Sequence, residues 1–213
     1  PYVIGGSKSF VTSTQLKRFG VNGTVQVEAS PTFMVTVDGF YSNFDDDQSK
    51  RGIELPLGFS NPYTASSVVD GPFGGFVEEG TFNNVQGVVR NDVFQRQADL
   101  YSGGINLDYD GDDGWSAFFD FGYSRTDRNE LSIESYSGTG YNAGNGAADT
   151  IGFVSDTEGT FFNPTLDYSN PGLIVLTDPL GWGGARVQAG YWNDREVKDE
   201  LFQYRLGIAR ELD

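Results

Sequence analysis

Hydrophobic and polar residues alternate along several segments of the chain, as they do in strands that expose one apolar and one polar face. In residues 17–29 the apolar positions are odd-numbered, including Val21 and Val25, while polar residues take the even positions. The same alternation returns after Pro31 and continues through residues 33–42. Because the break between the two segments is very short, the sequence predicts a β-hairpin there.

A second pair of alternating segments lies in the middle of the chain. Apolar residues take every other position in residues 101–109 and again in residues 115–123. Residues 110–114 between them consist of Asp and Gly, which is the composition of a tight turn. The sequence therefore predicts a second hairpin, and the alternation in residues 200–212 predicts a further strand.

Two segments, residues 45–92 and 130–199, lack regular alternation and are interrupted by Gly, Pro, Asn and Ser. We predict that both are long loops, the second with room for short strands. Both lie at the same end of the predicted hairpins, whereas the tight turns at residues 30–32 and 110–114 lie at the other end. This asymmetry is typical of outer-membrane barrels, which have short periplasmic turns and long extracellular loops.

The spacing of aromatic residues on the apolar face gives a second indication. Tyr101 and Tyr109 are eight positions apart, and so are Trp115 and Tyr123. Eight residues at about 3.3 Å each, tilted by roughly 40°, rise by about 20 Å, close to the apolar band of about 25 Å in membrane barrels. A soluble β-sandwich also contains such hairpins and is the alternative on alternation alone.

Composition narrows the chemistry of the protein. The 29 glycines and the 15% of aromatic residues favour an all-β fold. The absence of cysteine and histidine excludes disulfides and cysteine nucleophiles, and it removes the commonest general base. A formal charge of −16 argues against a nucleic-acid partner. We therefore predict a protein that is not an enzyme, with no catalytic residues, no metal site and no cofactor.

Several short motifs resemble those of TonB-dependent receptors. They are GVNGTVQ at residues 20–26, VTVDGFYS at residues 35–42 and RGIELPL at residues 51–57. The resemblance implies that residues 1–213 are part of one antiparallel transmembrane β-barrel domain in the bacterial outer membrane. It also implies uptake of a scarce ligand, such as an iron chelate, cobalamin or a saccharide.

In this family the barrel encloses an N-terminal plug, which receives energy from a complex in the inner membrane. This sequence contains neither a plug nor an energy-coupling box, so we expect it to be an internal part of a larger protein. The expected partners are outer-membrane lipid, a small ligand of the siderophore or saccharide class, and the inner-membrane energy-transducing complex acting through the missing plug. A passive porin and a soluble extracellular carbohydrate-binding module are the alternatives.

Aromatic residues of the predicted loops are the candidate ligand-binding residues, because their rings can stack on sugars or on the apolar surface of a chelate. The alternative is that they only pack the loops together. The candidates are Phe73, Phe76, Tyr136, Tyr141, Trp182 and Trp192. The Asp-rich residues 108–114 fail the EF-hand pattern and are predicted to be a polar hairpin turn.

Overall fold

The computed structural model describes residues 1–59, 61–139 and 147–211. Strands account for 73% of the structure, and none of these described residues is helical, which confirms the predicted all-β class. Nowhere in the described ranges is there a helix with the length and hydrophobicity that a membrane span requires.

The described residues form ten strands, and most of their length lies in five long strands. These five are β1 (Ser7–Ser30), β2 (Phe33–Leu55), β5 (Val88–Asp110), β6 (Trp115–Gly138) and β10 (Gly190–Arg210). The shorter strands are β3 (Tyr63–Val69), β4 (Phe76–Val85), β7 (Asp149–Asp156), β8 (Gly159–Pro164) and β9 (Val175–Leu176).

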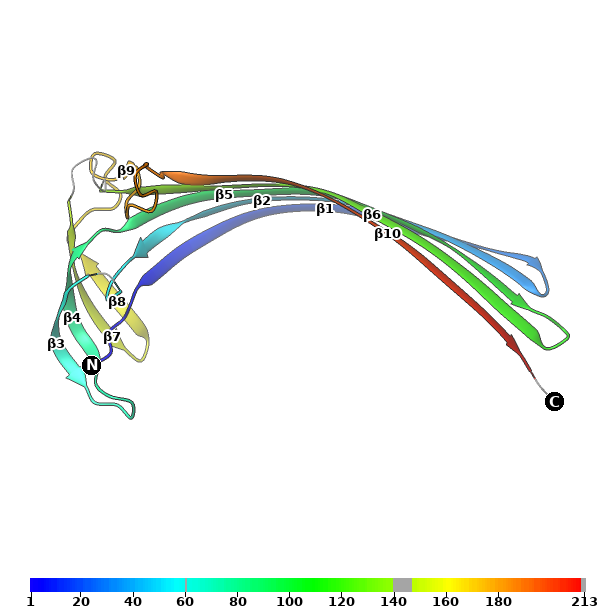
Figure 1. Cartoon of the computed structure of the whole chain (residues 1–213), viewed down its shortest axis with the longest axis horizontal. Coiled ribbons are helices and arrows are strands. Elements are labelled where there is room, and N and C mark those ends of the chain that lie inside the picture. The colour runs from blue at the N-terminus through cyan, green and yellow to red at the C-terminus, as the bar shows by residue number, and fades with distance from the viewer. Residues whose placement is uncertain (60, 140–146, 212–213) are drawn as a thin grey trace. The chain divides into compact units, whose positions relative to one another are not determined.

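Two antiparallel sheets contain all of these strands. The larger sheet has the order β1-β2-β5-β6-β10, with β9 paired to β6, and Figure 1 shows its five long strands side by side. The smaller sheet has the order β3-β4-β7-β8. Neither sheet closes into a barrel within the described part of the chain, so β1 and β10 are the edges of the larger one.

Both predicted hairpins are confirmed. In the β1–β2 turn the hydroxyls of Ser30 and Thr32 lie 3.2 Å apart, within hydrogen-bond distance. In the β5–β6 turn the amide of Gly111 donates to the carbonyl of Trp115 at 2.8 Å. Gly114 has a φ of 77°, which a residue with a Cβ rarely adopts, so glycine suits this turn. The Asp-rich segment is thus a hairpin turn, as predicted.

The prediction of two long irregular loops is wrong, although the short strands allowed for residues 130–199 are present. Residues 45–92 contain the second half of β2, all of β3 and β4 and the start of β5. Residues 130–199 contain the end of β6, three short strands and the first half of β10. Hydrophobic alternation fails here for a physical reason. Charged residues replace apolar ones in the continuing long strands, and β4 has a register shift between Phe82 and Val85 that breaks its period of two.

The smaller sheet is held by a compact apolar core. Phe82 on β4 stacks on Phe153 on β7 at a ring distance of 4.7 Å, and both are buried. Leu57, which follows β2, and Ile151 on β7 are fully buried in the same core, together with Val77 and Val85 on β4. Strands too short to be stable alone are therefore stabilised by burying one face together.

The chain divides into two compact units. Unit 1 comprises Pro1–Ser13, Gln48–Val93 and Ser132–Trp192, and it contains the smaller sheet with its core. Unit 2 comprises Thr14–Asp47, Phe94–Leu131 and Asn193–Asp213, and it contains the two hairpin turns. Each unit provides a separate candidate site.

Candidate functional site

The long strands of unit 2 have one apolar face, and contacts between aromatic rings define it. Phe19 on β1 lies 6.4 Å from Tyr41 on β2, which in turn lies 5.1 Å from Tyr101 on β5. Phe121 on β6 lies 5.2 Å from Tyr204 on β10. All of these residues were assigned to the apolar face from the alternation, so that assignment is confirmed.

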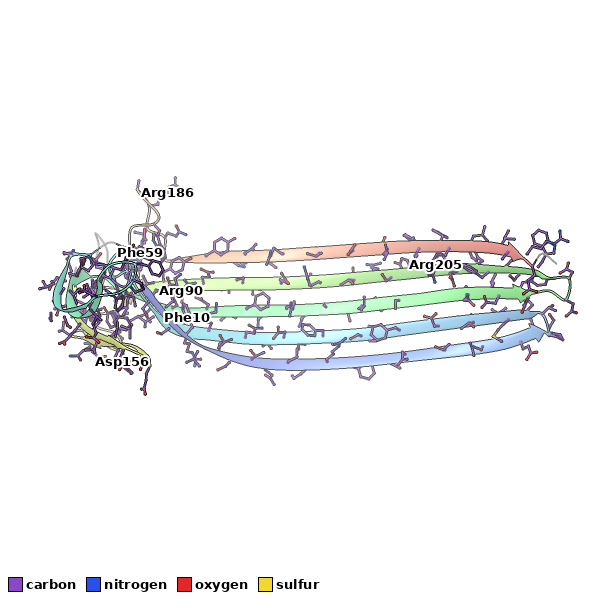
Figure 2. All side chains as sticks on the ribbon, turned by 90° about the horizontal axis from the view of Figure 1, so that it is seen from below. Phe10, Phe59, Arg90, Asp156, Arg186 and Arg205 are labelled. Atoms are coloured by element: carbon purple, nitrogen blue, oxygen red, sulfur yellow. The ribbon has the colours of Figure 1, made fainter. Side chains whose placement is uncertain are left out.

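The opposite face of unit 2 is polar and carries hydrogen bonds and ion pairs. Asn106 donates to Asp120 at 2.7 Å, and the Arg205 guanidinium lies 3.0 Å from the same carboxylate. Figure 2 labels Arg205. Arg18 donates to Ser42 at 3.3 Å. A hollow of about 300 Å³ surrounds the Asp120–Arg205 pair. Its polar-face lining residues are Asp38, Ser102, Asn106, Asp120, Ser124, Gln203 and Arg205.

The apolar face ends abruptly at its row of tyrosines. Tyr41 donates its hydroxyl to Asp99 at 2.8 Å, and Asn43 donates to the same carboxylate oxygen at 3.0 Å. Both hydrogen bonds hold the pKa of the Asp99 carboxyl below its ordinary value, and the one from Asn43 has the larger effect. On the neighbouring strand β6, Arg125 forms an ion pair with Asp127 at 2.8 Å. We call this charged border beyond the tyrosines the polar margin.

In unit 1 a nearly buried arginine gathers three carboxylates. Arg90 on β5 lies 2.8 Å from Glu54, 2.9 Å from Asp92 and 2.7 Å from Glu134, and Figure 2 labels this arginine. Lys8 on β1 lies 3.2 Å from Glu54. Burial acts to lower the pKa of Arg90, but the hydrogen bond and charge of Asp92, with the other two carboxylates, raise it above its ordinary value. We call these five residues the Arg90 cluster.

Two of the predicted binding residues lie against the Arg90 cluster and contact each other. The Arg90 guanidinium lies 4.8 Å from the ring centre of Tyr136, and Tyr136 meets Trp182 edge to face at 5.1 Å. Burial, and then the hydrogen bond that its hydroxyl donates to Glu134, raise the pKa of Tyr136 to about 12. Trp182 remains 46% exposed. We call this pair the Tyr136–Trp182 platform.

A buried carboxylate holds the backbone of this platform in place. Asp178 accepts hydrogen bonds from the amides of Trp182 and Gly183, each at 2.8 Å. Each bond to a charged acceptor contributes about 1.5–3 kcal/mol, which is enough to order a short turn. The indole is therefore presented by a rigid segment, which reduces the entropy that ligand binding would cost.

The other predicted binding residues are dispersed. Phe73 lies in the β3–β4 connection and is 88% exposed, while Phe76 begins β4 and pairs with Val69. Trp192 lies on β10 and is 73% exposed. Within the described ranges, no ring contact joins any of these three to the platform. Tyr141 lies outside the described residues.

Sequence reasoning missed the Arg90 cluster and Asp178. Glu54 and Arg90 are far apart in the chain, and nothing in the local pattern links them. Asp178 did carry a signal, because the dipeptide Asp178-Pro179 favours the start of a turn. Its hydrogen bonds to the amides four and five residues later are not part of that signal. Among the described residues no group of three His, Cys, Asp or Glu side chains is placed to hold a metal ion. The platform can stack on a ligand, and the polar faces can donate and accept hydrogen bonds.

No protein-family model matches the chain, and no curated protein matches its sequence. The resemblance to TonB-dependent receptors therefore stays a prediction based on the motifs and on the arrangement of the faces.

Proposed function

We propose that this chain forms part of the wall of a bacterial outer-membrane β-barrel that takes up a scarce ligand, in the manner of TonB-dependent receptors. The observation that carries the proposal is the abrupt change on the apolar face of unit 2. Tyr41 and Tyr101 lie at the border of the apolar face. The polar residues Asp99 and Asn43 follow directly beyond them. Tyrosine is favoured where hydrocarbon meets water, because its ring is apolar and its hydroxyl is polar.

The energetics of the two faces support a membrane rather than water on the apolar side. Val25, Val27 and Leu206 are each more than half exposed, and exposed apolar patches of this extent are rare on soluble monomers. Ion pairs such as Asp120 with Arg205 occupy the other face, where a watery or plug-filled lumen can solvate them. A passive porin would have the same two faces, and only transport and ligand measurements separate it from a receptor.

The open edges of the larger sheet also fit this proposal. A strand edge in lipid leaves backbone N–H and C=O groups unpaired, at a cost of several kcal/mol for each group. Membrane barrels of a single chain contain about eight strands or more. The wall formed by β1, β2, β5, β6 and β10 would therefore be completed by further strands, from a longer polypeptide or from neighbouring copies.

The membrane assignment is tested by spin labels on single cysteines, which the cysteine-free chain allows without background. In lipid vesicles, labels at positions 37, 105 and 119 should be accessible to lipid-dissolved oxygen, because these positions lie on the apolar face. Labels at Thr36, Asp38 and Asp120 should be accessible to a water-soluble nickel chelate instead. Equal access on both faces, or a folded monomer in plain buffer, would contradict the proposal.

The ligand-binding part of the proposal rests on the Tyr136–Trp182 platform. Adding a ferric hydroxamate chelate, cobalamin or a maltooligosaccharide should change the tryptophan fluorescence if one of these classes stacks on Trp182. Trp182→Ala should abolish the change and weaken binding about tenfold, because stacking of this kind contributes about 0.5–1.5 kcal/mol beyond area burial. Trp192→Ala is the matched control. If both variants lose the same amount of ligand affinity, the platform is not the ligand-binding site.

A further inference from the structure

The polar face of unit 2 contains a second hollow, close to the two hairpin turns. Its volume is about 950 Å³, which lies within the range of small-molecule sites. Its lining includes Met34 on β2, Asp108 on β5 and Phe118 on β6. All three residues take positions that alternation assigns to the polar face. We call it the Phe118 hollow.

Asp108 and Phe118 are cross-strand neighbours in this hollow. Asn106 on β5 donates to Asp120 on β6 at 2.7 Å, which fixes the register of this antiparallel pair. Two positions closer to the β5–β6 turn, the same register sets Asp108 opposite Phe118. Side chains at opposed positions on one face have Cβ atoms about 4.5–5.5 Å apart. The Asp108 carboxylate is therefore next to an aromatic ring.

Met34 extends this row on the other side of Asp108. The amide of Asp110 donates to the carbonyl of Thr32 at 2.9 Å, which fixes the register of β2 against β5. Two positions away from that pair, the register sets Met34 opposite Asp108. Met34 and Phe118 are 39% and 40% exposed. Two accessible apolar side chains therefore flank one carboxylate on a polar face.

The ring of Phe118 lies over a glycine of the next strand. A Cβ built at Gly207 on β10 would overlap that ring, so the ring covers bare backbone there. An aromatic ring in this position offsets the cost of a glycine within a strand. The ring is therefore ordered before any ligand binds, which reduces the entropy that binding would cost.

The charged side chains that line the Phe118 hollow are all acidic. None of its described lining residues is Lys or Arg. On β10 the Arg205 guanidinium pairs with Asp120 at 3.0 Å, and that of Arg210 lies 5.2 Å from the centre of another ring. No ion pair between described residues includes any of the four carboxylates that line the hollow, which belong to Glu28, Asp108, Asp110 and Glu211. The hollow therefore attracts cations.

The arrangement suits an organic cation better than a metal ion. Carboxylates that bind one metal ion converge on it, but no group of three among the described residues is placed to do so. An ammonium group that carries methyl groups can contact the face of an aromatic ring and a carboxylate together. Met34 offers an adaptable apolar contact to the rest of such a molecule.

We propose that the Phe118 hollow binds a small organic cation, with its ammonium group between the ring of Phe118 and the carboxylate of Asp108 and its apolar part against Met34. The support is the charge complementarity, the volume of the hollow and the two apolar side chains beside the carboxylate. The proposed membrane location is not required, because this site lies on the polar face.

The test is isothermal titration of the protein in a neutral detergent with butyrylcholine, which has a quaternary ammonium and a short apolar arm. Its uncharged isostere, in which carbon replaces the ammonium nitrogen, is titrated in parallel, and titrations into detergent alone are subtracted. The wild type should bind butyrylcholine about tenfold more tightly, because only the cation is attracted by the ring and the carboxylates. Raising the ionic strength to about 1 M should remove most of this difference.

Phe118→Leu should weaken binding of butyrylcholine about two- to fivefold, which is the contribution of one cation–π contact at an exposed site. Phe119→Leu is the matched control, because Phe119 is one position away on the apolar face and should not affect binding. Gly207→Ala should weaken binding to a similar extent, since the added methyl group displaces the ring without removing it. It keeps the test decisive if Phe118→Leu does not fold.

Asp108→Asn should weaken binding by up to about fivefold, as expected for one exposed ion pair. Asp112→Asn removes the same charge from the exposed turn outside the hollow and should have no effect. Equal losses in these two variants would show that only the net charge acts, and would overturn the site. Wild-type binding by Phe118→Leu, or equal affinity of the wild type for butyrylcholine and its isostere, would overturn it as well.

Other outcomes distinguish this inference from the proposed function. If the spin labels report water on both faces while Phe118→Leu weakens binding, the membrane location is wrong and the cation site stands. If the labels report lipid on the apolar face but the isostere binds as tightly as butyrylcholine, only the cation site is wrong. Tighter binding of Ca²⁺ than of butyrylcholine would replace the organic cation by a metal ion and overturn the inference.

Discussion

Val25→Arg is expected to destabilise the protein in lipid by about 2–4 kcal/mol, because it places a charge on the apolar face near the centre of the proposed membrane span. Val25 lies on β1 and is 63% exposed, so no packed core is disturbed by the larger side chain. The measurement is the free energy of unfolding in vesicles. Unfolding is monitored through the intensity of the heat-resistant band of the folded protein on gels. We expect that band to be lost.

The neighbouring residue provides the control. Thr24→Arg introduces the same side chain one position away, on the polar face, and should cost less than about 0.5 kcal/mol, as exposed substitutions usually do. Phe19→Arg lies at the edge of the apolar face and should cost about 0–1 kcal/mol, because the penalty falls toward the interface. Equal costs at positions 24 and 25 would show that both faces meet water.

Arg90→Met is expected to cost roughly 3–5 kcal/mol, because it leaves the nearly buried Asp92 without its cation and Glu54 with only the exposed Lys8. The Arg90 side chain is 10% exposed, and those of Glu54 and Asp92 are 12% and 11% exposed. The change should also loosen Tyr136, since the guanidinium lies over its ring. Unfolding of the protein in detergent, followed by near-ultraviolet circular dichroism, measures both effects.

Arg186→Met is the matched control, because the Arg186 side chain is exposed (Figure 2). Its replacement should lower the free energy of unfolding by no more than about 0.5 kcal/mol. A triple variant with Arg90→Met, Glu54→Gln and Asp92→Asn should recover part of the stability. Its amides need no cation and can still hydrogen-bond. Wild-type stability of Arg90→Met would mean that water solvates the carboxylates and that the Arg90 cluster is not closed.

The parts of the fold that were predictable are those governed by local rules. Alternation with a period of two identifies which residues share a face, whatever the partner strand is. For this reason the apolar faces around Tyr41 and Phe121 and both hairpin turns were predicted from the sequence and are confirmed. The contrast between apolar and polar faces, which carries the proposed function, was therefore already visible in the amino-acid pattern.

The parts that were not predictable depend on partners distant in the chain. The long strands continue through segments without apolar alternation because charged residues pair across strands there, as Arg96 does with Asp46 at 3.1 Å. The smaller sheet forms because Phe82 and Phe153 bury each other, although the irregular register of β4 hides its period. These segments were predicted as loops because local alternation was their only visible signal.

The sequence by itself determined the all-β class, the two hairpins and the two faces of their strands, because side-chain alternation is a property of each strand alone. Only the tertiary structure decided which carboxylates surround Arg90 and which aromatic residues meet at Trp182. The physical reason is that strand order and register bring residues together across tens of positions. No local pattern contains that information.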